Sequence, residues 1–328
     1  ISWKGVLMET ERAETEAGSE FLRSRDSWFR PTSLRTGPDG GLYVADLYRL
    51  VIEHPEWIDT GLTREMIADG RLRAGHDRGR IYRILPACGK ALSPPELAES
   101  SPARLASALD SPNGWQRDSA HMMLTWLDDP ARQAAIPVLR NILRESAMPE
   151  ARLQATSALA DLQGLTRPDL SVALLDAHPE VRRNGLRTGS LNSDRLLQQA
   201  TGLLRDKSPH VQMQAAYALA HTNDKEVGLA LGRFLVRHAD QAYLRASGLT
   251  AARKHIGTIL SAILQGEQTP SSHALIGAMT AQLSPEEASS LIPELIEDLI
   301  EKSSQSRDNF HSIFSSAAGL LRISTEMP

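Results

Sequence analysis

The chain has 328 residues, of which 41% are hydrophobic and 23% are charged, and its formal net charge is −4. These values are typical of a globular protein with two or three domains, and the acidic balance gives no electrostatic case for binding nucleic acid or an anionic membrane. One cysteine, Cys88, is present, which excludes an internal disulfide and a cysteine-based metal or haem site in this chain. The sequence contains no apolar run long enough to predict a membrane span.

The first residues, Ile1-Ser2-Trp3-Lys4, lack both an initiator Met and the apolar segment of a signal peptide. We therefore expect that residue 1 is not the biological start and that the chain is part of a longer protein.

Residues 1–88 have the pattern of β-strands. The run Gly37-Pro38-Asp39-Gly40-Gly41 predicts a turn, since Pro presets φ and Gly accepts positive φ. Apolar residues alternate on both sides of this turn, in residues 31–35 and 42–48, which predicts a hairpin. Further strands are expected at residues 5–9 and 79–85. We interpret this part as the terminal part of a β-propeller, about one blade and the edge of another. Such a piece has unpaired edges, so we expect remaining propeller blades or a protein partner at its N-terminal edge.

Residues 89–328 follow a helical period. A landmark containing Pro112, Pro149, Pro179 and Pro209 recurs at intervals of about 30 to 37 residues and leads each time into an Ala/Leu helix, with a weaker copy near Tyr243. Pro fits the first turn of a helix, Asp before it can cap that helix, and Ala allows close approach of neighbouring repeats. The predicted fold is therefore a multidomain α and β chain, a partial β-propeller followed by an α-helical HEAT-repeat solenoid.

Arginines recur after the landmarks, at Arg117, Arg152, Arg182 and Arg245. They could line a groove for an acidic partner, or they could form a structural ladder to helix ends and to the Asp of the next repeat; we favour the ladder. Asn113-Gly114 could belong to a ligand loop, but we favour the interhelix turn of the first repeat, with Trp115 as a packing anchor.

The candidate site residues lie in the strand-rich part, near strand ends, where propellers place their binding sites. His54 and Glu53 are the candidates for catalysis, and Asp46 and Arg80 are the candidates for holding a cofactor. His can act as a base, Asp and Glu as acids or Ca²⁺ ligands, and Arg as an anion clamp. The alternative is structural: Arg and Asp brace the blade, and Glu53-His54-Pro55 shapes a loop. No metal ligand set can be assigned, because no zinc motif or His pair near carboxylates occurs, and nucleotide-binding and nucleophile motifs are also missing from the sequence.

The chain also resembles a bacterial family, the membrane-bound dehydrogenases of planctomycetes and verrucomicrobia, which are similar to glucose/sorbosone dehydrogenases. The resemblance rests on these runs: Glu20-Phe21-Leu22, Ser27-Trp28-Phe29-Arg30-Pro31, Gly37-Pro38-Asp39-Gly40, Leu42-Tyr43-Val44, Val51-Ile52-Glu53-His54-Pro55, Gly79-Arg80-Ile81-Tyr82-Arg83 and Ser111-Pro112-Asn113-Gly114-Trp115. It is specific in the first 120 residues and generic beyond them.

The resemblance implies an exported or periplasmic protein of sugar or alcohol oxidation. Family members typically carry a cytochrome c domain with a CxxCH motif after the HEAT array, and the related sugar dehydrogenases hold pyrroloquinoline quinone and Ca²⁺ in the propeller. This chain has no CxxCH motif. We therefore expect no cofactor within this chain, and a HEAT array that acts as spacer and docking surface. The alternative function is a non-catalytic scaffold that binds a protein or a polysaccharide.

Overall fold

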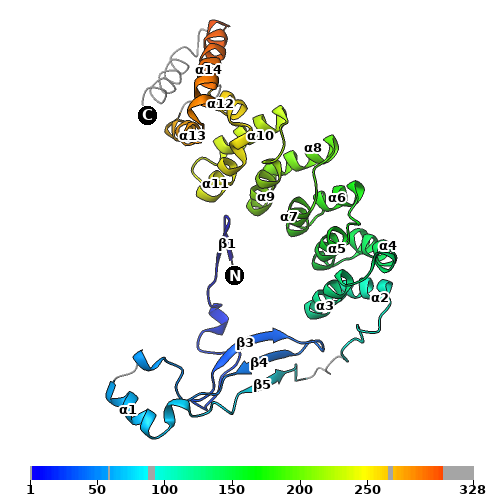
Figure 1. The fold of residues 1–328 in the computed structure, drawn as a ribbon, viewed down its shortest axis with the longest axis vertical. Coiled ribbons are helices and arrows are strands. Elements are labelled where there is room, and N and C mark those ends of the chain that lie inside the picture. Colours follow the sequence, from blue (N-terminus) through cyan, green and yellow to red (C-terminus); the bar gives the residue numbers. More distant parts are fainter. Residues whose placement is uncertain (1, 58–59, 88–92, 265–268, 306–328) are drawn as a thin grey trace. The chain divides into compact units, whose positions relative to one another are not determined.

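The computed structural model describes residues 2–57, 60–87, 93–264 and 269–305 (Figure 1). The expected domain boundary after residue 88, and Cys88 itself, lie outside these ranges. By its internal contacts the chain divides into two compact units, one formed by Ile1–Ser2 with Glu9–Ile142 and one formed by Trp3–Met8 with Leu143–Pro328. The described chain is mostly helical and carries a small antiparallel sheet near its N-terminus.

The sheet of the first unit has the strand order β3-β4-β5, with β3 at Pro31–Thr36, β4 at Leu42–Asp46 and β5 at Arg80–Ile84. Both pairings are antiparallel, and the register places Val44 beside Leu34 and Tyr82. The predicted hairpin around Gly37–Gly41 and the predicted strand near residue 80 are thus confirmed. A further strand pair joins β1, Ser2–Lys4, to β2, Leu7–Glu9.

The sheet buries little of its apolar surface. Val44 is fully buried, but Leu34 is 50% exposed and Ile81 is 73% exposed. Both outer strands, β3 and β5, have one neighbour each among the described residues. The segment between β4 and β5, for which the sequence pattern predicted no helix, contains the helix α1, Thr60–Ala68.

The remaining helices follow the sheet in chain order. They are α2 Pro102–Ser107, α3 Gly114–Thr125, α4 Asp129–Glu145, α5 Pro149–Asp161, α6 Arg167–Leu174, α7 Pro179–Thr188, α8 Asp194–Gly202, α9 Pro209–Leu219, α10 Lys225–Arg237, α11 Ala242–Ala251, α12 Ile256–Leu264, α13 Pro270–Thr280 and α14 Pro285–Gln305. A short 3-10 turn, η5, covers Leu203–Arg205.

Local sequence explains where these helices begin. Pro149, Pro179 and Pro209 occupy the first turn of α5, α7 and α9, where a missing N–H costs no hydrogen bond. Thr166 and Asp169 form a reciprocal capping box at the start of α6. The predicted helix starts at Pro149, Pro179 and Pro209 are therefore confirmed, whereas Pro112 precedes Asn113, the N-cap of α3, and lies outside that helix.

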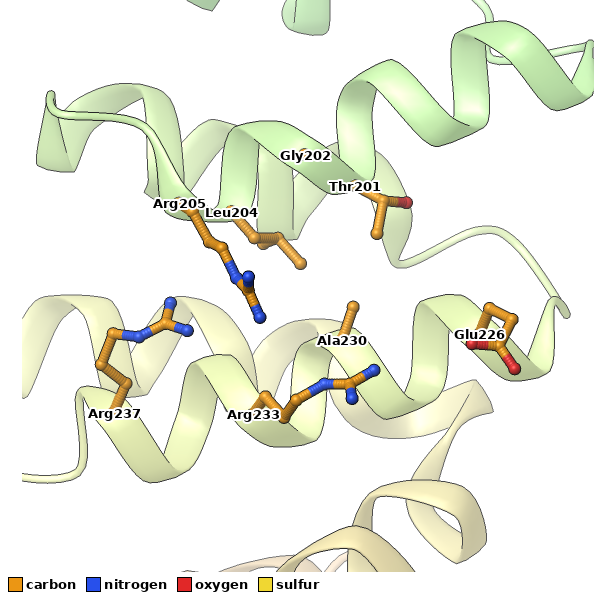
Figure 2. A pocket seen from close by; sticks show the side chains of 8 residues that line it. All are labelled: Thr201, Gly202, Leu204, Arg205, Glu226, Ala230, Arg233 and Arg237. Carbon is orange, nitrogen blue, oxygen red and sulfur yellow. The ribbon is translucent and has the colours of Figure 1, made fainter.

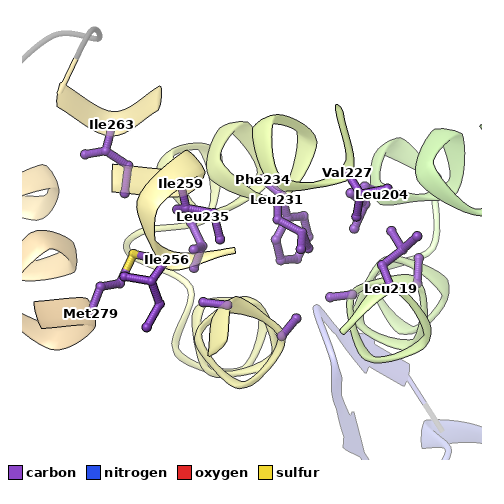
Figure 3. Packing of buried hydrophobic residues seen from close by; sticks show 14 of the residues in the cluster. Leu204, Leu219, Val227, Leu231, Phe234, Leu235, Ile256, Ile259, Ile263 and Met279 are labelled. Atoms are coloured by element: carbon purple, nitrogen blue, oxygen red, sulfur yellow. The ribbon is translucent and has the colours of Figure 1, made fainter. Parts of the chain in front are cut away.

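Within the second unit the helices from α5 to α12 pack in two rows. One row contains α5, α7, α9 and α11, each in contact with the next, and the other contains α6, α8, α10 and α12 (Figure 1). A continuous cluster of buried apolar side chains runs between the rows, and Figure 3 shows the part around Leu231, Phe234 and Ile259. Small residues bring helices close together: a Cβ at Gly232 of α10 would lie 3.0 Å from the Cβ of Ala262 in α12.

Candidate functional site

Two of the four predicted site residues, Asp46 and Arg80, are directly paired across β4 and β5. Asp46 is 3% exposed, and its Oδ1 accepts hydrogen bonds from the backbone N–H groups of Arg30, at 2.7 Å, and Tyr48, at 2.9 Å. Its Oδ2 is buried and has no hydrogen-bond partner among the described residues. Asp46 thus fixes the backbone where β3 begins and β4 ends.

Arg80 lies over an aromatic ring beside this carboxylate. Its guanidinium carbon is 3.6 Å from the ring centroid of Tyr48, a cation–π geometry, and its Nη1 is 3.4 Å from the Tyr82 hydroxyl. Tyr48 has a φ of 51°, a left-handed conformation that costs a non-glycine residue free energy, and its ring centroid is 5.7 Å from that of Trp28. The hydrogen bond from the Trp28 backbone N–H lowers the pKa of nearby Asp26, and the Tyr48 hydroxyl lowers it further.

The other two predicted residues, Glu53 and His54, are exposed and make local contacts. Glu53 Oε2 accepts a hydrogen bond from the backbone N–H of Ile52, and His54 Nδ1 is 3.8 Å from Glu56 Oε1. The His54 side chain is 66% exposed. No contact joins these two side chains to Asp46 or Arg80 within the described part of the chain, so the structure brings together only two of the four candidates.

The Asp46 position does not suit a Ca²⁺ ion. A calcium site needs several oxygen ligands, and no group of three or more His, Cys, Asp or Glu side chains with metal-binding geometry occurs in the described residues. The positive charge of Arg80, the cross-strand neighbour of Asp46, also opposes a cation there.

The turn Gly37–Gly41 is held by helix α3 rather than by a ligand. Asn113 caps α3 by accepting from the N–H of Trp115, and its side-chain amide donates to the carbonyls of Gly37, at 3.0 Å, and Pro38, at 3.1 Å. Gln116 donates to the same Pro38 carbonyl. Asn113 is 7% exposed, whereas Trp115 is 39% exposed and therefore only partly a packing anchor.

The recurring arginines form a ladder of hydrogen bonds. Arg152 Nε and Nη2 donate to the two carboxylate oxygens of Asp176 at 2.7 and 2.8 Å, and Arg182 makes the same pair of bonds to Asp206. Burial would raise the pKa of Asp176, but hydrogen bonds from Arg152 and from the backbone of His178 outweigh it and leave that pKa below its ordinary value. We call these two pairs the Arg–Asp clamps.

A second regularity joins all five landmarks. In each, the side chain after the landmark donates to the backbone carbonyl six residues earlier, as shown by Arg117 to Ser111, Arg152 to Ser146, Arg182 to Asp176, Gln212 to Asp206 and Arg245 to Ala239. The predicted bond to the Asp of the next repeat is thus confirmed for Arg152 and Arg182, whereas Arg117 and Arg245 bond to the carbonyl of their own turn.

A different set of arginines does surround a hollow. It lies between the end of α8 with η5 and the helix α10, has a volume of about 250 Å³, and is shown in Figure 2. We call it the arginine groove; its lining residues are Thr201, Gly202, Leu204, Arg205, Glu226, Ala230, Arg233 and Arg237. The sequence pattern did not predict this set. The available signal was the pair Arg233 and Arg237, which lie one helical turn apart on the same helix.

Another hollow, of about 590 Å³, lies along α3 in the first unit. Its lining includes Trp115, Met122 and Trp126, and the Trp126 side chain is 70% exposed. In the described ranges, no helix combines the length and the apolar character needed to cross a lipid bilayer.

Comparisons with known proteins give little beyond this geometry. A family model described as "Domain of unknown function (DUF7133)" matches residues 1–87, the part that holds the sheet. No curated protein matches the chain. A solved structure that is similar to it is the crystal structure of an engineered protein from the Northeast Structural Genomics Consortium. The identity is 16%, the match covers 69% of this chain and 97% of that one, and the TM-score is 0.34, which does not establish a common fold.

Proposed function

We propose that this chain is part of an exported protein in which a β-propeller precedes a HEAT-type α-solenoid, and that the helical part is a rigid spacer and docking surface. The observation that carries the docking role is the pair of Arg–Asp clamps, Arg152 with Asp176 and Arg182 with Asp206. Each clamp joins one helix pair to the next through two charge-assisted hydrogen bonds. Repeats joined in this way keep their outer surface in one arrangement, which favours rigid-body recognition of a partner.

The open sheet supports the propeller part of the proposal. Strands β3 and β5 are both outer strands of the described sheet, and Leu34 and Ile81 expose half or more of their surface. Exposed edges and exposed apolar faces are the features that further blades or a protein partner would cover.

The redox part rests on the sequence resemblance to quinone-dependent sugar and alcohol dehydrogenases. In that role His54 and Glu53 would act in catalysis and Asp46 and Arg80 would hold a cofactor, with pyrroloquinoline quinone, Ca²⁺ and c-type haem in the full-length protein. Asp46 and Arg80 are adjacent, which is compatible with an anionic group near Arg80, but Asp46 is poorly suited to Ca²⁺ for the reasons given above.

A non-catalytic scaffold for a protein or a polysaccharide is the second candidate. The exposure of His54, and the lack of any described contact from it to Asp46 or Arg80, favour this role. A general base needs a defined position within hydrogen-bond reach of its substrate, and an exposed loop histidine with a neighbour at 3.8 Å provides no such position by itself.

The deciding experiment is the intact mass of the native protein, with an absorption spectrum and a sugar and alcohol oxidation assay on the same sample. A mass above 35.9 kDa, a c-type haem band and substrate oxidation would support the dehydrogenase role. The absence of haem and of oxidation, in the presence of added quinone and Ca²⁺, would reject that role and leave the scaffold.

The docking role has its own measurement, amide hydrogen exchange across α5, α7 and α9 in the wild type and in the double variant R152M/R182M. If the clamps hold the array rigid, exchange in the variant rises in all three helices while the helix content is retained. Unchanged exchange would show that apolar packing alone sets the arrangement, and the argument from the clamps would fail.

A further inference from the structure

The arginine groove contains three guanidinium groups that lack partners. No hydrogen bond or ion pair joins the side chains of Arg205, Arg233 and Arg237 to any residue that the structure describes. In the same unit Arg152 and Arg182 are each bound to a carboxylate. The two kinds of arginine therefore differ in their contacts although their residue type is the same.

The groups converge from two helices that are separate in sequence. In Figure 2 the Arg205 side chain extends from η5 toward α10, while Arg233 and Arg237 project from α10 beside the same space. On α10 the spacing of Glu226, Ala230, Arg233 and Arg237 places all four on one face. Like charges one helical turn apart repel each other. The repulsion between Arg233 and Arg237 therefore raises the free energy of the groove when it holds no anion.

The floor of the groove is apolar and small. Leu204 is 2% exposed at its base, and Ala230, with only a methyl group, leaves room between the arginines on either side. A volume of about 250 Å³ admits one anionic group with a short apolar stem. Glu226 lies at the other end of the row, so the positive charge is confined to the end near Arg233 and Arg237.

We propose that the arginine groove binds the oxyanion of an acidic ligand, a carboxylate or phosphate group whose short apolar stem rests on Leu204 and Ala230. Arginine offers a planar fork of N–H donors that matches such oxygens, and an anion beside Arg233 and Arg237 offsets the repulsion between their charges. The oxyanion can come from a free small anion or from an acidic peptide segment. The inference does not depend on the redox part of the proposed function.

Calorimetric titration of the full chain tests this proposal, at a constant ionic strength of about 0.15 M set with chloride. Three probes are used separately: inorganic phosphate, succinate and a hexaglutamate peptide. We expect saturable binding of at least one probe to the wild type. Binding of phosphate or succinate as tightly as the peptide identifies a free anion as the source, and clearly tighter binding of the peptide identifies an acidic segment.

The variants R233Q and R237Q should weaken that binding by about tenfold each, because each removes one charge-assisted contact. The matched control is R195Q on α8, which removes the same charge from an exposed arginine that is outside the groove lining. It should change the affinity by less than about twofold at this salt concentration. Circular dichroism of each variant establishes that it is folded. The proposal is overturned if no probe saturates, or if R195Q weakens binding as much as R233Q does.

Discussion

Arg152 and Asp176 lie 24 residues apart and form a two-pronged pair, with Nε to Oδ2 at 2.7 Å and Nη2 to Oδ1 at 2.8 Å. Arg182 and Asp206 repeat this separation and these distances one helix pair later. In both pairs the carboxylate also receives a backbone N–H from two residues further on, that of His178 or of Ser208. Each Asp therefore holds the backbone of its own loop through one hydrogen bond and also binds the Arg of the preceding helix pair.

Removal of the Arg152 side chain should destabilise the second unit strongly. The variant R152M leaves the Asp176 carboxylate, whose side chain is 6% exposed, buried without its ion-pair partner, which costs about 3–5 kcal/mol. Urea denaturation followed by circular dichroism measures the cost. The control R183M breaks an exposed pair with Glu180 and should cost less than about 1 kcal/mol. Equal costs would contradict the assignment of Arg152 as a clamp.

The buried His238 should make stability fall with acid. Burial lowers the pKa of His238, the positive charge of Arg237 lowers it further, and Gln241 opposes this weakly. The unfolded chain, with the ordinary pKa near 6.5, then takes up a proton that the folded chain refuses. Stability is complete above that pH and declines below it, by at most about 1.4 kcal/mol per pH unit for this group.

The measurement is urea denaturation at pH 7.5 and pH 5.5 for the wild type and for H238L. The ring of His238 packs 4.8 Å from that of Phe234, so an apolar replacement keeps the contact. We expect a smaller difference between the two pH values in H238L. His255, whose pKa is also lowered chiefly by burial, accounts for part of the remaining dependence. An identical difference in H238L and in the wild type would rule out His238 as its source.

Two glycines between α1 and β5, Gly70 and Gly75, distinguish the cost of a positive φ from the cost of a steric clash. Gly70 and Gly75 both have positive φ, 75° and 90°, but only Gly75 is in close contact: its Cβ would lie 2.3 Å from the carbonyl oxygen of Tyr48. The variant G70A should cost about 1–2 kcal/mol, the penalty of a left-handed backbone. G75A should cost more and should raise amide exchange near Tyr48. Similar stability of the two variants would show that the loop moves away from Tyr48 without resistance.

Asn113 has two functions that one substitution can separate. The variant N113D keeps an oxygen that caps α3 but loses the amide donor to the carbonyls of Gly37 and Pro38. Amide exchange should therefore rise in the turn Gly37–Gly41 and remain unchanged at the start of α3. N113A should raise exchange in both places. If N113D leaves the turn protected, Gln116 alone holds it.

Local patterns predicted the elements well. Short-range features define the turn around Pro38, the strands that flank it and the helix starts at Pro149, Pro179 and Pro209. Each depends on a few neighbouring residues, whose restricted φ angles and turn preferences can be recognised from the sequence. Helix α1 was missed because residues 56–79 show no sustained apolar period. The propeller, the HEAT assignment and the dehydrogenase resemblance stay predictions, as do the roles of His54 and Glu53.

The sequence by itself determined the hairpin around Pro38, the helix starts at Pro149, Pro179 and Pro209, and the positions of the arginines that follow each landmark. Tertiary structure decided what each arginine does. Arg152 and Arg233 are the same residue type, yet Arg152 binds Asp176 of the next helix pair and Arg233 lines an open groove. Partners 24 residues apart come together through the packing of helix pairs, a long-range property that the local periods of a sequence do not contain.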